Sequence, residues 1–173
     1  MIVAIANQDG GSGKTVIANH LAQLRIRSGR KVMLVDAARA ATAGKLVTDL
    51  ELLRARYNDI VIDTEGRDTA ASRAALIAAR LAIVPIDVPV TPQQVDLASQ
   101  YKLIARLNTA RMFNPGLRVL FVLVADHPTD EECAAVRAYT ARVMSATLAS
   151  TVIHGEASAD MDALYHEVFS TNH

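Results

Sequence analysis

The sequence predicts an α/β fold in which a mostly parallel central sheet lies between two layers of helices. Short runs rich in Val, Ile and Leu alternate along the chain with longer segments of helical composition. Most of the short runs lack polar/apolar alternation, which is typical of strands buried on both faces of a parallel sheet. Strands and helices that alternate in this way connect through right-handed crossovers and place helices on both faces of the sheet.

Five apolar runs form the predicted strands: residues 2–6, 31–35, 60–63, 81–85 and 117–124. The segments between and after them form the predicted helices: residues 14–28, 41–56, 69–80, 92–111, 128–146 and 157–169. Gly29 follows the first helix, where a glycine commonly ends a helix. Asn114, Pro115 and Gly116 form a turn ahead of the fifth strand. No linker or internal repeat interrupts the series, so we expect residues 1–173 to form a single domain.

The composition is that of an ordinary globular domain and excludes several functional classes. At 173 residues, with 51% apolar and 21% charged residues, the chain can bury a core without a disulfide or a structural metal. The 18 basic and 18 acidic residues give zero net charge, which argues against a surface devoted to nucleic acid or to an acidic membrane. The aromatic content of 4% disfavours platforms that stack single-stranded bases.

The single cysteine, Cys133, limits the redox and metal chemistry available within one chain. One cysteine cannot form an internal disulfide, a four-cysteine zinc site or an iron–sulfur cluster. The N-terminal apolar stretch ends at Ala6 and lacks a basic flank, so we expect no secretory signal. No run reaches the ~18 apolar residues of a membrane span. We therefore expect a cytoplasmic protein with no membrane partner.

The most informative segment is a glycine-rich loop between the first strand and the first helix, Asp-Gly-Gly-Ser-Gly-Lys-Thr. Gly10, Gly11 and Gly13 allow backbone N–H groups to turn around a polyphosphate. The positive end of the following helix points to the same place. Lys14 can reach the β and γ phosphates, and the Thr15 hydroxyl can ligate Mg²⁺. The sequence thus predicts a three-layer, Rossmann-like P-loop NTPase fold.

The loop resembles the deviant phosphate loop of the ParA/MinD family of ATPases, Lys-Gly-Gly-x-Gly-Lys-Thr/Ser. Gln8 stands where the general P-loop pattern has glycine. The resemblance continues through Ser28-Gly-Arg-Lys-Val-Met-Leu-Val-Asp36 and through the Walker B-like strand Asp59-Ile-Val-Ile-Asp63. In size the chain is similar to the small plasmid-partition ParA proteins. The resemblance implies an ATP/ADP-binding switch with Mg²⁺-dependent ATPase activity, used in plasmid or chromosome partition or in positioning another cargo.

The resemblance also implies individual roles. The residues implied to hold the nucleotide are Asp9, Gly10, Gly11, Ser12, Gly13, Lys14, Thr15 and Val16. The residues implied to hold the Mg²⁺ shell are Thr15, Asp36 and Asp63. The position of Asp63 supports this role independently, because ligands bind at the carboxyl ends of parallel strands. A helix N-cap or turn role is the alternative for Asp63.

Two departures from the family's pattern bear on hydrolysis. Asp9 stands where the family has a lysine that reaches the partner's nucleotide across an ATP-sandwich dimer. A carboxylate there repels phosphate unless a cation compensates it. Ala38 stands where the family has an aspartate that helps to orient the attacking water, and Arg39 stands where it has proline. Without a positioned general base, we expect hydrolysis about 10²–10⁴-fold slower.

Other residues near the strand ends offer substitutes. Glu65 follows the Walker B aspartate closely and is our candidate for positioning water, so Lys14, Asp36 and Glu65 form the expected catalytic set. Arg39 or Arg67 are candidates for neutralising phosphate charge. The alternative is that Glu65 and Arg67 are exposed loop residues without a catalytic role.

The resemblance implies a nucleotide-dependent homodimer, a partner protein that stimulates hydrolysis, and binding of non-specific DNA through a basic dimer surface. The arginines available for that surface are Arg106, Arg111, Arg118, Arg137 and Arg142. The alternative is that they lie on solvated helix faces. The departures at Asp9 and Ala38 also keep open a nucleotide-binding scaffold or regulator with little ATPase activity. A biosynthetic enzyme on the same fold is a third hypothesis, for which the sequence offers no second substrate pocket.

Overall fold

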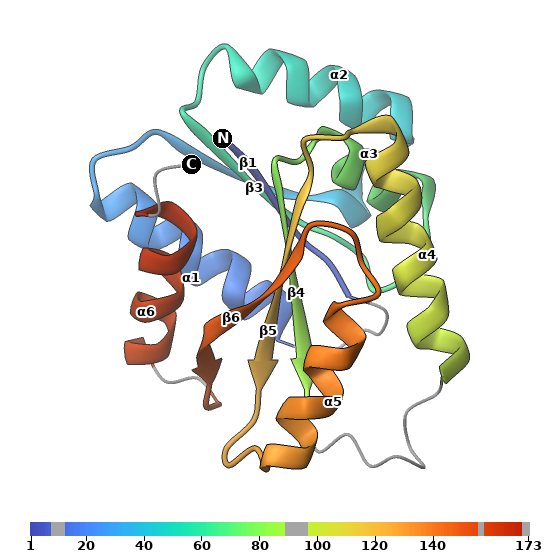
Figure 1. Cartoon of the computed structure of the whole chain (residues 1–173). Helices are drawn as coiled ribbons and strands as arrows, with labels where there is room; N and C mark the ends of the chain where they lie inside the picture. The colour runs from blue at the N-terminus through green and yellow to red at the C-terminus, as the bar shows by residue number, and fades with distance from the viewer. Residues whose placement is uncertain (8–12, 89–96, 156–157, 171–173) are drawn as a thin grey trace.

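The computed structural model describes residues 1–7, 13–88, 97–155 and 158–170, and their strands form a six-stranded sheet (Figure 1). The strands are β1 (Ile2–Ile5), β2 (Val32–Asp36), β3 (Asp59–Asp63), β4 (Leu81–Asp87), β5 (Arg118–Val124) and β6 (Ala146–Ile153). Their order across the sheet is β2-β3-β1-β4-β5-β6, and all five neighbouring pairs are parallel. The predicted α/β class and the parallel central sheet are confirmed.

Helices cover both faces of this sheet. They are α1 (Lys14–Arg27), α2 (Ala43–Arg54), α3 (Ala70–Ala78), α4 (Leu97–Phe113), α5 (Asp130–Thr140) and α6 (Ser158–Phe169), with a short 3-10 helix, η1 (Ala37–Arg39). Figure 1 shows α1 and α6 on one side of the strands and α2 to α5 on the other. The three layers that the sequence predicts are therefore present. None of the helices described is both long and apolar enough to cross a membrane.

The central strand β1 explains why the apolar runs lack alternation. Ile2 and Ala4 pack into the core beneath α2, α3 and α4, whereas Val3 and Ile5 pack into the core beneath α1 and α6. Successive side chains of a strand point to opposite faces, so a strand covered on both faces needs an apolar residue at every position. All four side chains are buried.

The sixth strand corrects the sequence prediction. A helix was expected over residues 128–146, but α5 ends at Thr140 and β6 begins at Ala146. Ser145 has a left-handed φ of 55°, which a continuing α-helix cannot accommodate. As an edge strand, β6 leaves Thr147 and Ser150 exposed. Its sequence therefore lacks the continuous apolar run that marks the inner strands. Residues 92–96 and 157 of two other expected helices lie outside the described residues.

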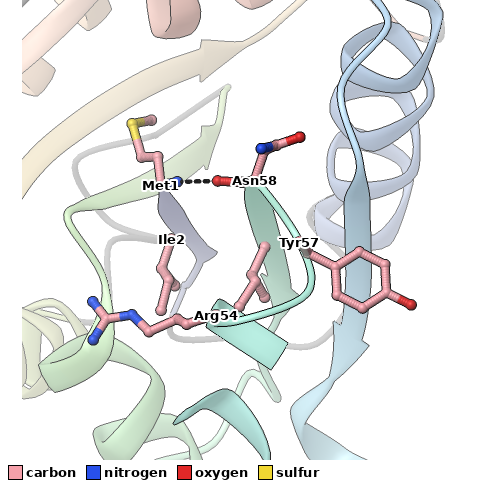
Figure 2. A pocket seen from close by; sticks show the side chains of 6 residues that line it. Met1, Ile2, Arg54, Tyr57 and Asn58 are labelled. Carbon is pink, nitrogen blue, oxygen red and sulfur yellow. Dashed lines mark hydrogen bonds between the residues drawn. The ribbon is translucent and has the colours of Figure 1, made fainter. Parts of the chain in front are cut away.

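At the amino-terminal edge of the sheet, where the strands begin, a buried carboxylate bonds to several parts of the chain. Asp59 is 2% exposed, and its oxygens lie 3.0 Å from the Met1 amine, 2.8 Å from Arg25 Nε and 3.2 Å from Arg30 Nε. The Met1 amine also donates to the Asn58 carbonyl at 2.6 Å, beside a pocket of about 260 Å³ (Figure 2). The strands are parallel, so this pocket lies at the opposite edge of the sheet from the strands' carboxyl ends.

The electrostatics of Asp59 set a pH dependence of stability. Burial by itself raises the pKa of Asp59, but hydrogen bonds and charges from the amino terminus and Arg25 outweigh it. The pKa therefore lies below its ordinary value of 3.8. A carboxyl group with a depressed pKa in the folded state stabilises the fold above its unfolded-state pKa. That stabilisation is lost as the pH falls through the folded-state pKa.

We predict that Asp59→Asn lowers the free energy of unfolding at pH 7 by about 3 kcal/mol, because it removes the buried carboxylate that pairs with three cationic groups. The variant should also lose less stability than the wild type as the pH falls below 3.8. Urea unfolding at a series of pH values measures both effects.

Asp49→Asn is the matched control, because Asp49 forms an exposed ion pair with Lys45 on α2. Its expected loss is below about 0.5 kcal/mol. Equal losses in the two variants would contradict the assigned role of Asp59. A loss of unfolding free energy below pH 3.8 in Asp59→Asn that equals the wild-type loss would also contradict it.

Candidate functional site

The candidate site lies at the carboxyl-terminal edge of the sheet, where β1, β2 and β3 end and α1 begins. The strand register places Ile5 beside Asp63, and Asp63 beside Asp36. The two predicted metal-shell carboxylates are thus on neighbouring strands. The predicted nucleotide residues Asp9, Gly10, Gly11 and Ser12 lie outside the described residues. Gly13 is the first described residue on the helix side of the loop.

The first turn of α1 is suited to an anion. Gly13 is the N-cap residue, with a left-handed φ of 63°, and it has no side chain to bond the first N–H groups of the helix. By contrast, threonine hydroxyls cap α2, α3 and α5. No acidic residue lies in the first turn of α1. An oxyanion would satisfy these N–H groups and interact favourably with the positive end of the helix dipole.

Lys14 begins α1 and is 7% exposed. Its Nζ donates to the Asn7 Oδ1, 2.5 Å away, and Asn7 is 5% exposed at the end of β1. A low-dielectric setting strengthens the attraction of an ammonium group for an anion. Asn7 is a residue that the sequence analysis missed. Val16, one residue beyond Thr15, packs against the core on the α1 side of the sheet.

Oxygen ligands of the kind that Mg²⁺ prefers meet beside Lys14. The Thr15 hydroxyl donates to the Asp63 Oδ2 at 2.6 Å. Asp36 accepts a hydrogen bond from the Ala38 N–H at 3.0 Å and pairs with the Arg39 Nε at 3.1 Å. Mg²⁺ takes one or two carboxylates together with water and substrate phosphates, so a hydroxyl and a carboxylate at hydrogen-bond distance fit its chemistry.

The loop that follows β3, residues 64–69, is attached at both ends. We call it the β3–α3 loop. Its buried Thr64 donates through Oγ1 to the Ile5 carbonyl at 2.7 Å. At the other end, Asp68 accepts two hydrogen bonds from Arg73 of α3, at 2.8 and 2.7 Å. These hydrogen bonds are the largest cause of a pKa of Asp68 below its ordinary value. Glu65 lies between these attachments and is partly buried.

Arg106 of α4 is a second residue whose role at the site the sequence did not predict. It was a candidate for a DNA-binding patch or a solvated face, but it is 6% exposed. It donates to the Asn7 carbonyl at 2.7 Å and to the Arg67 carbonyl at 3.1 Å. Helical periodicity could have located it, because it shares a face with the buried Leu103 and Ala110.

The other arginines of the expected patch also differ in their use. Arg111 is partly buried and donates to the Leu117 carbonyl at 2.6 Å and the Pro115 carbonyl at 3.3 Å, which closes the turn after α4. Arg118, Arg137 and Arg142 are exposed. Two of the five arginines therefore donate to backbone carbonyls within the protein, and the other three are exposed.

Comparisons with known proteins find a matching family model and solved structures of similar fold. The sequence model of the CobQ/CobB/MinD/ParA nucleotide binding domain matches residues 3–158. Among solved structures, a plasmid partition protein from Borrelia burgdorferi is similar at 14% identity and a TM-score of 0.71, over 99% of this chain and 98% of that one. No curated protein sequence matches the chain.

Two further solved structures share the fold. Cobyrinic acid a,c-diamide synthase from Mycobacterium smegmatis, with a bound ATP analogue and magnesium, is similar at 16% identity and a TM-score of 0.74, over 99% of this chain and 96% of that one. The septum site-determining protein MinD from Pyrococcus horikoshii, with Mg-ADP, is similar at 16% identity and a TM-score of 0.68, over 97% and 95%. At such identities the likeness shows the fold.

We predict that Asn7 and Lys14 are energetically coupled. In a double-mutant cycle of Asn7→Leu and Lys14→Met, the unfolding free energies should show a coupling of about 2 kcal/mol, because the pair forms a buried hydrogen bond to a charged group. Urea unfolding of the four proteins measures it. Lys14→Met combined with Asp49→Asn, which shares no partner with it, is the control. Additivity of the Asn7 and Lys14 changes within about 0.5 kcal/mol would refute the coupling.

Proposed function

The chain belongs to the CobQ/CobB/MinD/ParA nucleotide-binding domain family, and we propose that it is a ParA-like switch that binds ATP with Mg²⁺ and hydrolyses it to ADP. The observation on which this rests is the start of α1. There a helix whose N-cap residue, Gly13, has no side chain, the buried ammonium of Lys14 and the Thr15–Asp63 pair lie at the end of the glycine-rich loop. Each of these groups suits one part of a magnesium-bound triphosphate.

Phosphate binding is assigned to residues 9–16. The backbone of Asp9, Gly10, Gly11, Ser12 and Gly13 surrounds the phosphates in this proposal, and the N–H groups of the first turn of α1 complete the cradle. Lys14 exchanges the Asn7 amide for a phosphate oxygen. This exchange is favourable because an ion pair with a phosphate oxygen replaces a hydrogen bond to a neutral acceptor.

Thr15, Asp63 and Asp36 are assigned to the magnesium ion. A bound Mg²⁺ supplies positive charge that stabilises the negative charge on the transferring phosphoryl group. The Thr15 hydroxyl is the direct ligand from α1, and Asp63 orients it. Asp36 is next to Asp63 in the register and orients ligands of the outer shell. The solved structures of similar fold that contain magnesium and a nucleotide support this assignment.

Hydrolysis is assigned to Lys14, Asp36 and Glu65, with Glu65 positioning the attacking water. One observation favours a second function, a nucleotide-binding scaffold with little turnover. Asp36 is engaged by Arg39, and Ala38 offers no carboxylate in its place. In that case a partner protein, rather than hydrolysis, is the output of nucleotide binding.

The biological role that we propose is cargo positioning by a homodimer that forms on ATP. The similarity to a plasmid partition protein supports this role. Exposed arginines Arg118, Arg137 and Arg142 are the candidates for contacting non-specific DNA in the dimer, with a partner protein stimulating hydrolysis.

We predict that the wild type binds ATP more tightly with Mg²⁺ than with EDTA. Lys14→Ala should weaken binding about 10–100-fold, because it removes a charge-assisted contact. Thr15→Ala should bring the affinity in Mg²⁺ close to that in EDTA. Titration calorimetry measures these affinities. Lys45→Ala, which alters an exposed lysine on α2, is the control and should bind as the wild type does.

Turnover then separates the two functions. Loss of phosphate release in Glu65→Gln with retained ATP binding supports the assigned role of Glu65, whereas normal turnover in that variant removes it. Tight ATP binding with no turnover, with or without DNA, selects the scaffold. A wild type that binds no nucleotide contradicts both functions.

A further inference from the structure

Arg106 joins two segments that are far apart in the sequence. Its guanidinium donates to the Asn7 carbonyl at the end of β1 and to the Arg67 carbonyl in the β3–α3 loop. A guanidinium presents several N–H donors in a rigid fork, so one side chain can hold two carbonyls in a fixed relation. The two segments it joins belong to the candidate nucleotide site.

The stability of the fold alone does not explain this arginine. Arg106 is 6% exposed, and none of the described carboxylates accepts a hydrogen bond from it. Its Nε is buried without a hydrogen-bond partner among the described residues. Burial lowers the pKa of Arg106, while Asp68 acts on it from a distance in the opposite direction. An apolar side chain at this position in the core would avoid the desolvation of a charge.

Asn7, one of the two residues that Arg106 joins, also contacts Lys14. The Asn7 backbone carbonyl accepts from Arg106, and the side-chain amide of the same residue accepts from Lys14. Any change in the partner of Lys14 therefore acts on Asn7, whose peptide group Arg106 holds.

Arg67, the other residue that Arg106 joins, lies two residues after Glu65 in the β3–α3 loop. Thr64 is fixed to the Ile5 carbonyl, and Asp68 is fixed to Arg73 of α3. The Arg67 carbonyl also accepts the Thr69 N–H at 3.0 Å. Arg106 therefore attaches the middle of the β3–α3 loop, and the short stretch that holds Glu65 lies between two fixed points.

We propose that Arg106 is a positioning residue that couples Lys14 at the start of α1 to the β3–α3 loop. When Lys14 leaves Asn7 for a new partner, Arg106 transmits the change from the Asn7 peptide to the Arg67 carbonyl. Arg106 thereby sets the position of Glu65. Arg106 does not contact the reacting atoms in this scheme. The inference deepens the proposed function and rests on it, because Lys14 changes partner only when a nucleotide binds.

The test compares three variants of the full chain. Arg106→Met removes both hydrogen bonds, and Arg106→Lys keeps the charge but can reach one carbonyl at a time. Arg111→Met is the matched control. Arg111 is also an arginine of α4 that donates to two carbonyls and has a buried Nε without a partner among the described residues, but its carbonyls lie in the turn before β5.

Hydrogen exchange of residues 64–69 in nucleotide-free protein is the first measurement. We expect about tenfold faster exchange in Arg106→Met and Arg106→Lys than in the wild type, because the loop loses a hydrogen bond to a charged donor. Arg111→Met should exchange there as the wild type does, even where its overall stability falls. Equal exchange in Arg106→Met and Arg111→Met overturns the inference.

Nucleotide binding and turnover are the second measurement. Addition of Mg-ATP should slow exchange of residues 64–69 in the wild type and in Arg111→Met, and leave it unchanged in Arg106→Met. Turnover in Arg106→Met should fall about tenfold while the ATP dissociation constant changes less than about threefold. Equal protection of the loop in Arg106→Met and the wild type overturns the inference while the proposed function stands.

The two proposals fail separately. A wild type that binds no ATP contradicts the proposed function and removes the nucleotide-dependent coupling with it. In that case, hydrogen exchange of residues 64–69 in nucleotide-free Arg106→Met still decides whether Arg106 holds the loop.

Discussion

The burial of β1 on both faces, between two parallel neighbours, is the constraint on which the rest of the molecule depends. Its side chains are shared between two cores, and β3 and β4 flank it in parallel register. This arrangement brings the ends of β1, β2 and β3 to one edge, where Asn7, Asp36 and Asp63 lie beside the start of α1. A change in the direction or register of β1 would separate these groups, since parallel strands alone place all their carboxyl ends together.

The two edges of the sheet, where the strands begin and where they end, differ in the partners of their buried charged groups. At the amino-terminal edge, the buried carboxylate of Asp59 is paired with three cationic groups of the protein itself. At the carboxyl-terminal edge, the buried cations Lys14 and Arg106 donate to the neutral acceptors of Asn7 and Arg67. The first arrangement joins segments of the fold to one another, whereas the second places two cations at the candidate binding site.

The sequence was most informative where burial or backbone chemistry constrains residue choice. The inner strands could be predicted because both of their faces are covered. The glycine-rich loop with Lys14 and Thr15 predicted the strand-to-helix junction between β1 and α1. The edge strand β6 was missed because exposed Thr147 and Ser150 break its apolar pattern. Arg106 was assigned to the surface because composition alone treats arginine as a solvated residue. Contacts between distant segments, such as that of Lys14 with Asn7, depend on tertiary geometry that local patterns do not encode.

The most direct test of nucleotide binding at the start of α1 is a crystal structure with Mg²⁺ and a non-hydrolysable ATP analogue. We expect the triphosphate at the first turn of α1, Lys14 Nζ on a phosphate oxygen instead of Asn7, the metal beside Thr15 and Asp63, and Arg106 still bridging Asn7 and Arg67. A nucleotide bound elsewhere, or Lys14 still on Asn7 with the analogue present, would contradict it.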